Sequence, residues 1–338
     1  MNALLPSFHY THSPTLPKLL WELGCTLVFS TYQAGKVIFI RATSPEKIEQ
    51  HALDFPRPMG LAVSDQRIAV ATREEVVVLT NTSAEESTES QHADSGTLIR
   101  TTEGTYVQEK TYFSGEIDTH DLAWGKDGLW AINTLLSSMA FADGDSSFES
   151  QWRPPFVSDV VPEDRCHLNS MVIVDGQPEY VTAFGEVDTF EGWRENRISG
   201  GIVMDVPSGE IVLEGLPMPH SPRLYDGKLY LLLSGTGELV CAEPETGRYE
   251  VVAQLPGFVR GMARCGHYLF VGLSKLRKTS STFAALPISD QAVFSGIVVV
   301  SLREGRIVEH LKYETGVEEI YDVQVLTQGA AVDTTPPA

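Results

Sequence analysis

The chain has 338 residues, a formal net charge of −20 and a pI near 4.8. Its hydrophobic fraction of 42% is ordinary for a globular protein with a large core. The acidic balance argues against nucleic-acid binding, because phosphate backbones are bound by basic surfaces. No apolar run approaches the roughly 18 residues that a membrane span requires. We therefore expect no nucleic-acid partner and no membrane association.

The cysteines and the N-terminus indicate a compartment. Cys25, Cys166, Cys241 and Cys265 are widely spaced and form no CxxC pair. The first residues lack the charged segment and long apolar run of a signal peptide. These features predict a cytoplasmic protein whose thiols stay reduced.

Short β-rich runs separated by polar turns follow one another along the chain. They include residues 25–33, 36–41, 58–63, 67–72, 75–80, 118–124, 129–134, 166–174, 219–225, 228–233, 258–264 and 268–273. Asp175-Gly176 and Asp226-Gly227 lie between such runs, and Asp-Gly is a strong signal for a two-residue hairpin turn. Residues 81–104 depart from this rhythm and are predicted to form a mobile surface insertion. The pattern predicts an all-β fold.

The β-rich runs repeat as units. Their openings near Pro58, His120, Asn169, Arg223 and Met262 are separated by roughly 40 to 60 residues, a period typical of β-propeller blades. The N-terminal segment lacks an inner strand, whereas the C-terminal run 321–326 is a lone strand. Pairing the two would close the ring and remove open sheet edges.

These considerations predict a single six-bladed β-propeller closed by pairing of the C-terminal strand with the N-terminal blade. A seven-bladed ring is the alternative. The predicted organisation is an N-terminal extension over residues 1–19, the propeller over 20–326 and a disordered tail over 327–338.

Several motifs carry a family resemblance. They are Ser-Thr-Tyr-Gln-Ala-Gly-Lys at 30–36, Asp-Arg-Cys-His-Leu-Asn at 164–169, Met-Pro-His-Ser-Pro-Arg at 218–223, Pro-Gly-Phe-Val-Arg-Gly at 256–261, Gly-Leu-Ser-Lys at 272–275 and Glu-Ile-Tyr-Asp-Val at 319–323. Through them, the chain resembles an uncharacterised bacterial family of six-bladed propeller proteins from about Leu20 to Leu326. More distantly, the blade pattern is similar to NHL and SMP-30-like propellers. The resemblance implies the fold and transfers no activity.

Polar residues stand where the inner strands begin, so they are expected to converge on the central channel. Among them, His120, His167 and His220 could form an open zinc or iron site, because imidazoles from three blades would leave a position for water or substrate. Alternatively, each histidine forms hydrogen bonds within its own blade.

The remaining channel residues are assigned to substrate binding or catalysis. Arg57, Asn169, Arg223 and Trp193 are predicted to bind substrate, and Asp121, Arg260 and Tyr321 to serve catalysis, with Asp121 or Tyr321 as general acid or base. The arginines could clamp a carboxylate or phosphate, or could instead pair with nearby acids. Those acids are Asp118, Asp121, Asp164 and Asp322. Trp152, Phe156, Phe190 and Trp193 could form an aromatic rim over one channel mouth, or pack the loops on the propeller face.

Three functional interpretations follow. We favour a channel-centred, metal-dependent enzyme, such as a lyase, hydrolase or oxygen-using enzyme, that acts on a small anionic or peptide-like substrate. The alternatives are a propeller that binds a small ligand without catalysis, and a scaffold that binds a protein partner. The sequence contains no P-loop, EF-hand loop or G-x-S-x-G elbow that would indicate another chemistry.

Overall fold

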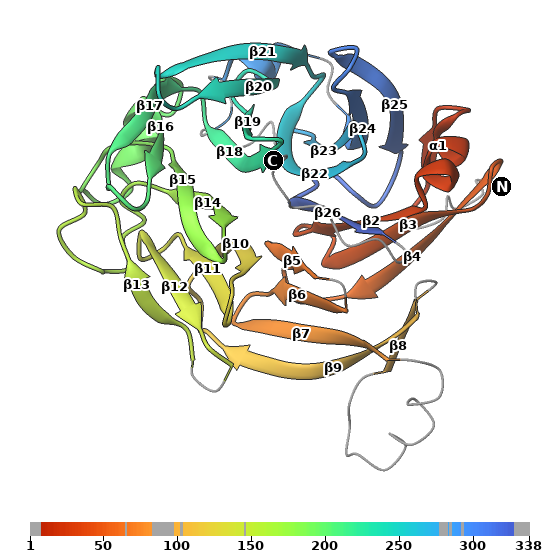
Figure 1. Cartoon of the computed structure of the whole chain (residues 1–338), viewed down its shortest axis with the longest axis horizontal. Helices are drawn as coiled ribbons and strands as arrows, with labels where there is room; N and C mark the ends of the chain where they lie inside the picture. Colours follow the sequence, from red (N-terminus) through yellow and green to blue (C-terminus); the bar gives the residue numbers. More distant parts are fainter. Residues whose placement is uncertain are drawn as a thin grey trace, which may run out of the picture.

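Six antiparallel sheets lie around a central axis like the blades of a propeller (Figure 1). The computed structural model describes residues 8–64, 66–82, 98–101, 104–144, 147–276, 283, 286–291 and 294–327. The predicted all-β, six-bladed architecture is confirmed, and the seven-bladed alternative is wrong.

The strands of the first three blades follow one another from the axis outward. Blade 1 contains β26 (Asp322–Thr327), β2 (Cys25–Thr31), β3 (Lys36–Ser44) and β4 (Lys47–Asp54). Blade 2 contains β5 (Leu61–Val63), β6 (Arg67–Ala71), β7 (Glu75–Thr82), β9 (Gly104–Phe113) and β8 (Leu98–Thr101). Blade 3 contains β10 (Thr119–Trp124), β11 (Leu129–Asn133), β12 (Ser138–Ala142) and β13 (Glu149–Trp152).

The other three blades follow in chain order. Blade 4 contains β14 (Leu168–Val174), β15 (Gln177–Ala183), β16 (Gly201–Asp205) and β17 (Ile211–Leu216). Blade 5 contains β18 (Pro219–Tyr225), β19 (Lys228–Leu233), β20 (Glu238–Glu243) and β21 (Arg248–Gln254). Blade 6 contains β22 (Phe258–Cys265), β23 (Tyr268–Ser274), β24 (Ser295–Ser301), β25 (Arg306–Tyr313) and β1 (Tyr10–His12).

The core lies between the blades. Every residue of β2 and of β24 is buried, because both faces of each blade pack against a neighbour. This explains the continuous apolar runs in the middle strands, where a sheet with one wet face would alternate. A hydrophobic cluster fills each of the six junctions between blades, for example Phe29 with Phe270 between blades 1 and 6.

Closure of the ring depends on the last strand. β26 pairs with β2 from Ser30↔Asp322 to Cys25↔Thr327, so the C-terminal strand forms the inner strand of the first blade. The predicted closure is confirmed. The predicted Asp-Gly turns are also present, with φ values of 49° and 78° at Asp175 and Gly176 and of 52° and 72° at Asp226 and Gly227. Positive φ at both positions is what a type I′ hairpin turn requires.

The N-terminal segment packs on the propeller. β1 pairs with β25, and α1 (Leu16–Leu23) buries Leu16 and Leu20 against the junction of blades 1 and 6. The predicted propeller boundary at Leu20 falls within α1. Within the described residues, no helix is long and apolar enough to cross a membrane. Residues 83–97 of the predicted insertion, and the predicted tail from residue 328, lie outside the described residues.

One residue of each inner segment takes part in a closed ring of contacts between blades. These ring residues are Asp322, Gly60, Asp121, Ser170, Ser221 and Gly261. Four of them accept a backbone N–H of the next blade: Asp322 from Leu61, Asp121 from Met171, Ser170 from Ser221, and Ser221 from Gly261, at 2.9–3.1 Å.

The two glycines complete the ring by close approach of backbones. A Cβ on Gly60 would lie 2.7 Å from Asp121 Cα, and one on Gly261 would lie 2.5 Å from Val323 N. Only glycine leaves room for such contacts. The ring therefore joins all six blades around the axis and fixes the backbone from which the channel side chains project.

Candidate functional site

Irregular pairing of the inner strands directs side chains toward the channel. The registers of β10, β14, β18 and β22 with their neighbours all shift beside the ring residues. Such bulges release a residue from the regular ladder and redirect its side chain. In every blade but the fourth, the residue before the ring residue lines a cavity; these are Tyr321, Met59, His120, His220 and Arg260.

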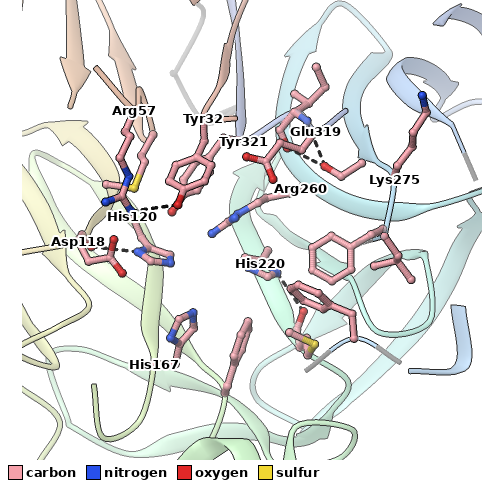
Figure 2. Close-up of a pocket in the computed structure, with 18 of the residues that line it drawn as sticks. Tyr32, Arg57, Asp118, His120, His167, His220, Arg260, Lys275, Glu319 and Tyr321 are labelled. Carbon is pink, nitrogen blue, oxygen red and sulfur yellow. Dashed lines mark hydrogen bonds between the residues drawn. The ribbon is translucent and has the colours of Figure 1, made fainter. Parts of the chain in front are cut away.

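The cavity has a volume of about 310 Å³, a size suited to a small molecule (Figure 2). All six blades contribute, either through an inner strand or through an adjoining loop. The lining consists of Tyr32, Arg57, Met59, Asp118, His120, His167, Phe184, Trp193, Arg194, Met218, His220, Phe258, Arg260, Ser274, Lys275, Leu276, Phe283, Glu319, Ile320 and Tyr321.

Four lining residues have an unusual backbone conformation. Arg57, Asp118, His167 and Met218 each lie three positions before a ring residue and have φ of 52°, 58°, 52° and 55°. Left-handed backbone at residues other than glycine costs on the order of 1 kcal/mol or more and is concentrated at functional sites. The left-handed conformation recurs at four residues around one cavity, which favours this end of the channel as a functional site.

The charge of the lining is opposite to that of the whole chain. Arg57, Arg194, Arg260 and Lys275 are basic, whereas Asp118 and Glu319 are acidic. Arg194 pairs with Glu191 at 2.8 Å and stacks on Trp193, so its charge is neutralised locally. Lys275 extends away from Arg260 (Figure 2).

Arg260 is a cation of the cavity without an ion-pair partner among the described residues. Its guanidinium carbon lies 3.6 Å from the ring centroid of Tyr321, and no described residue forms a hydrogen bond or ion pair with the guanidinium. Tyr321 is 6% exposed, and its hydroxyl has no hydrogen-bond partner within the described part of the chain. Burial raises the pKa of Tyr321 well above its usual value, more than Arg260 lowers it, so the phenol stays protonated. An anion here would meet both a charge and a hydrogen-bond donor.

Arg57 adds a second cation to the cavity lining. Its Nη2 donates to the Tyr32 hydroxyl at 3.1 Å, and its guanidinium stacks on the Tyr32 ring at 4.8 Å (Figure 2). The Nε of Arg57 is buried without a partner among the described residues. No carboxylate of the described chain forms an ion pair with either arginine.

Hydrogen bonds fix the protonation of two imidazoles. His120 Nδ1 donates to the Asp118 carbonyl at 3.0 Å, and a carbonyl can only accept. His220 Nδ1 donates to Ser234 Oγ at 2.6 Å and to the Met218 carbonyl at 3.2 Å, while the Ser234 hydroxyl donates to Val259 O. Burial lowers the pKa of both histidines well below the usual value, and Arg260 lowers it further. Both rings are therefore neutral, with a bare Nε2.

His167 approaches the cavity from a different backbone position. Its Nδ1 donates to both carboxylate oxygens of Asp164, at 2.9 and 3.0 Å. His120 and His220 come directly before a ring residue, but His167 lies three positions before one. The ring centroids of His120 and His167 are 4.9 Å apart, whereas Phe184 lies between His167 and His220, at 4.5 and 5.1 Å from their centroids.

The predicted three-histidine metal site stays a prediction. No group of three or more His, Cys, Asp or Glu side chains in the described residues is placed to hold a metal ion. The physical reason is that Phe184 separates His167 from His220 and that the three rings do not start from equivalent positions. The structure still brings all three to one cavity.

Three other predicted site residues lie outside the cavity lining. Arg223 faces Asp121 at 3.8 Å and Asp322 at 3.7 Å, which confirms the ion-pairing alternative for this arginine. Asp121 also accepts the backbone N–H of Leu122 and Met171. Asn169 is 1% exposed and accepts the Thr182 hydroxyl at 2.7 Å. These contacts account for all three residues as parts of the framework below the cavity.

Aromatic residues that the sequence did not single out cover the cavity. Phe184, Phe258 and Met218 form a buried cluster with Trp193. Of the predicted aromatic rim, Trp193 lines the cavity, whereas Trp152 and Phe156 pack between blades 3 and 4 and Phe190 is exposed. Phe184 and Phe258 flank strand ends, and their apolar character alone did not distinguish them from core.

The comparisons place the chain in a family. Residues 14–333 match the family described as Domain of unknown function (DUF4915). The chain belongs to this family. No curated protein matches the sequence.

Solved structures support the fold. A chain of a nidogen/laminin complex has 13% identity and a TM-score of 0.56, covering 91% of this chain and 100% of its own. A protein of unknown function from Bacteroides caccae has 10% identity and a TM-score of 0.54, covering 90% and 99%. At such identities the similarity concerns the fold alone. The distant resemblance to NHL and SMP-30-like propellers stays a prediction.

Proposed function

We propose that the cavity at the end of the channel binds a small anionic molecule. The observation that supports this most directly is Arg260, a cation that faces the cavity with no described anionic partner. Arg260 is partly buried, and an anionic ligand would supply the counter-charge that its guanidinium lacks. In a chain of net charge −20, an acidic partner for Arg260 would have been easy to supply.

The neighbours of Arg260 favour the same ligand. The Tyr321 hydroxyl adds a donor without an acceptor, and Arg57 adds a second cation without a carboxylate. Phe184, Trp193 and Phe258 supply apolar walls that exclude water and strengthen the electrostatic attraction. A phenol and a guanidinium fork also suit the oxygens of a carboxylate or phosphate.

The test measures binding of a panel of small carboxylates and inorganic phosphate by titration calorimetry. We expect Arg260→Gln to weaken binding by about 10- to 100-fold, because a hydrogen bond to a charged group contributes about 1.5–3 kcal/mol. Arg264→Gln is the matched control, since Arg264 pairs with Asp226 on the surface outside the cavity. Equal affinity of the wild type and Arg260→Gln for every bound anion would contradict the proposal.

A metal-dependent reaction is the second candidate. The observation in its favour is that His120, His167 and His220 each donate Nδ1–H to an acceptor, the arrangement that orients metal-ligating histidines. Such a metal would be zinc or iron, and movement of Phe184 would have to bring the rings together. Elemental analysis of protein purified without an affinity tag tests this candidate. A metal site formed by the protein would be fully occupied after reconstitution. A metal content below about a tenth of an equivalent per chain would refute this candidate.

A further inference from the structure

Two hydrogen-bond acceptors in the cavity remain unused. The Nε2 atoms of His120 and His220 are bare because the Nδ1 protons are committed to Asp118, Met218 and Ser234. Neither Nε2 has a partner among the described residues. In both rings, the hydrogen bonds of Nδ1 lie on the side turned away from Arg260 (Figure 2). The ring edges nearer Arg260 therefore present acceptors.

The aromatic side chains packed against these rings do not satisfy the two acceptors. Phe184 and Phe258 contact the His220 ring and have no polar atom. The single donor of Trp193, Nε1, is bonded to Asp164 at 2.9 Å. Asp118 contributes a further acceptor, since its carboxylate has no hydrogen-bond or ion-pair partner in the described chain and lines the same cavity. No described side chain donates to this group of acceptors, so a ligand in the cavity can supply the donors.

We propose that the ligand is a small hydroxy- or amino-carboxylate, whose carboxylate meets Arg260 and Tyr321 and whose O–H or N–H groups donate to His120 and His220. This inference rests on the proposed anion site and specifies the class of ligand that binds there. A carboxylate fits the donors available, because one guanidinium fork and one phenol match two oxygens. The neighbouring imidazoles then select for a hydroxyl or amino group, since a ligand without one leaves buried acceptors unpaired.

The experiment compares matched acids that differ only at one carbon. The sets are propionate, lactate and alanine; succinate, malate and aspartate; and 3-phenylpropionate, 3-phenyllactate and phenylalanine. Each compound is titrated calorimetrically into the full chain near neutral pH. In at least one set we expect the hydroxy or amino acid to bind about tenfold tighter than its parent, the effect of one additional hydrogen bond of about 1.4 kcal/mol.

Variants separate the two proposals. His120→Phe removes one acceptor at similar size and is expected to abolish the tenfold preference, while His267→Phe, outside the cavity, preserves it. His220→Phe provides an independent second variant, checked for folding by circular dichroism. Arg260→Gln is expected to weaken all members of a set by the same factor.

The outcomes are distinct. Equal affinities within every set, with binding still dependent on Arg260, would overturn the ligand class and leave the anion site standing. Binding that does not depend on Arg260, or no binding by any acid, would overturn both. Tighter binding of inorganic phosphate than of every acid, or loss of the preference after chelator treatment, would also overturn the ligand class.

Discussion

Two layers of side chains line the channel, and both come from the inner strands. The polar groups of the ring layer have partners within the protein, whereas polar atoms of the cavity layer lack one among the described residues. In the ring layer, Asp121 and Asp322 accept backbone N–H groups of the next blade and face Arg223, so its charged and polar groups have partners. One residue earlier in the chain, Tyr321, His120, His220 and Arg260 carry polar atoms that no described residue satisfies. The difference teaches that the satisfied polar groups hold the blades together, whereas the unsatisfied groups are the ones that the proposed ligand would contact.

The largest loss of stability is expected from removing the charge of Arg223, the cation that faces the ring layer. Arg223→Gln leaves Asp121 and Asp322 as buried carboxylates without a counter-charge, which costs about 3–5 kcal/mol of unfolding free energy. Urea denaturation above pH 7 measures the loss. Arg264→Gln, which breaks an exposed pair with Asp226, is the control and is expected to cost about 0–1 kcal/mol. Similar losses in both variants would mean that the ring layer has no special role.

A methyl group added to the ring is expected to have the next largest effect. Gly60→Ala places a Cβ 2.7 Å from Asp121 Cα, so the backbones of blades 2 and 3 must separate. Overpacking of this kind costs about 1–3 kcal/mol. Gly257→Ala is a suitable control, because its nearest neighbour, Leu273, would lie at an ordinary 3.5 Å. Equal midpoints in urea for the two variants would refute the close-approach argument.

The acidity of the ring layer predicts a pH dependence of stability. Burial raises the pKa of Asp121 to about 7 and raises that of Asp322, against the opposing effect of Arg223. Because the folded-state pKa of Asp121 exceeds the unfolded value of 3.8, its contribution is fully present below about pH 4 and is lost as pH rises through 7.

Denaturation at pH 5 and pH 8 measures this dependence. The unfolding free energy of the wild type is expected to fall between the two values, and Asp121→Asn is expected to show a smaller fall. An equal or steeper fall in Asp121→Asn would show that other groups dominate.

The cavity layer is expected to tolerate substitution with the smallest change in stability. Tyr321→Phe removes a buried hydroxyl that has no described partner, so the unfolding free energy stays constant or rises by up to about 1 kcal/mol. Binding of the anion weakens at the same time, because a donor is lost. Thermal denaturation and calorimetry measure the two effects. A destabilised Tyr321→Phe with unchanged binding would place Tyr321 in the framework instead.

The fold was largely predictable from the sequence, because most of its signals are local and the ring offered one way to close. Asp175-Gly176 and Asp226-Gly227 specify hairpins through their own backbone preferences, and the lone run 321–326 had one place to pair. The arrangement of the cavity side chains was not predictable in the same way, because it depends on features that have no local sequence signal. The bulge at His220 and the left-handed backbone at His167 decide where each ring points, and Phe184 enters the site from a strand end. Only the pairing of strands far apart in sequence determines these positions.

Closure by β26 also bears on how the protein is made. Tyr321 and Asp322 lie at the start of this strand, next to Ser30 of β2, from which they are separated by about 290 residues of chain. During synthesis, β2 leaves the ribosome long before its inner partner exists, and such distant pairings fold slowly. The cavity is therefore completed last, so that only a chain translated through β26 can form the proposed binding site.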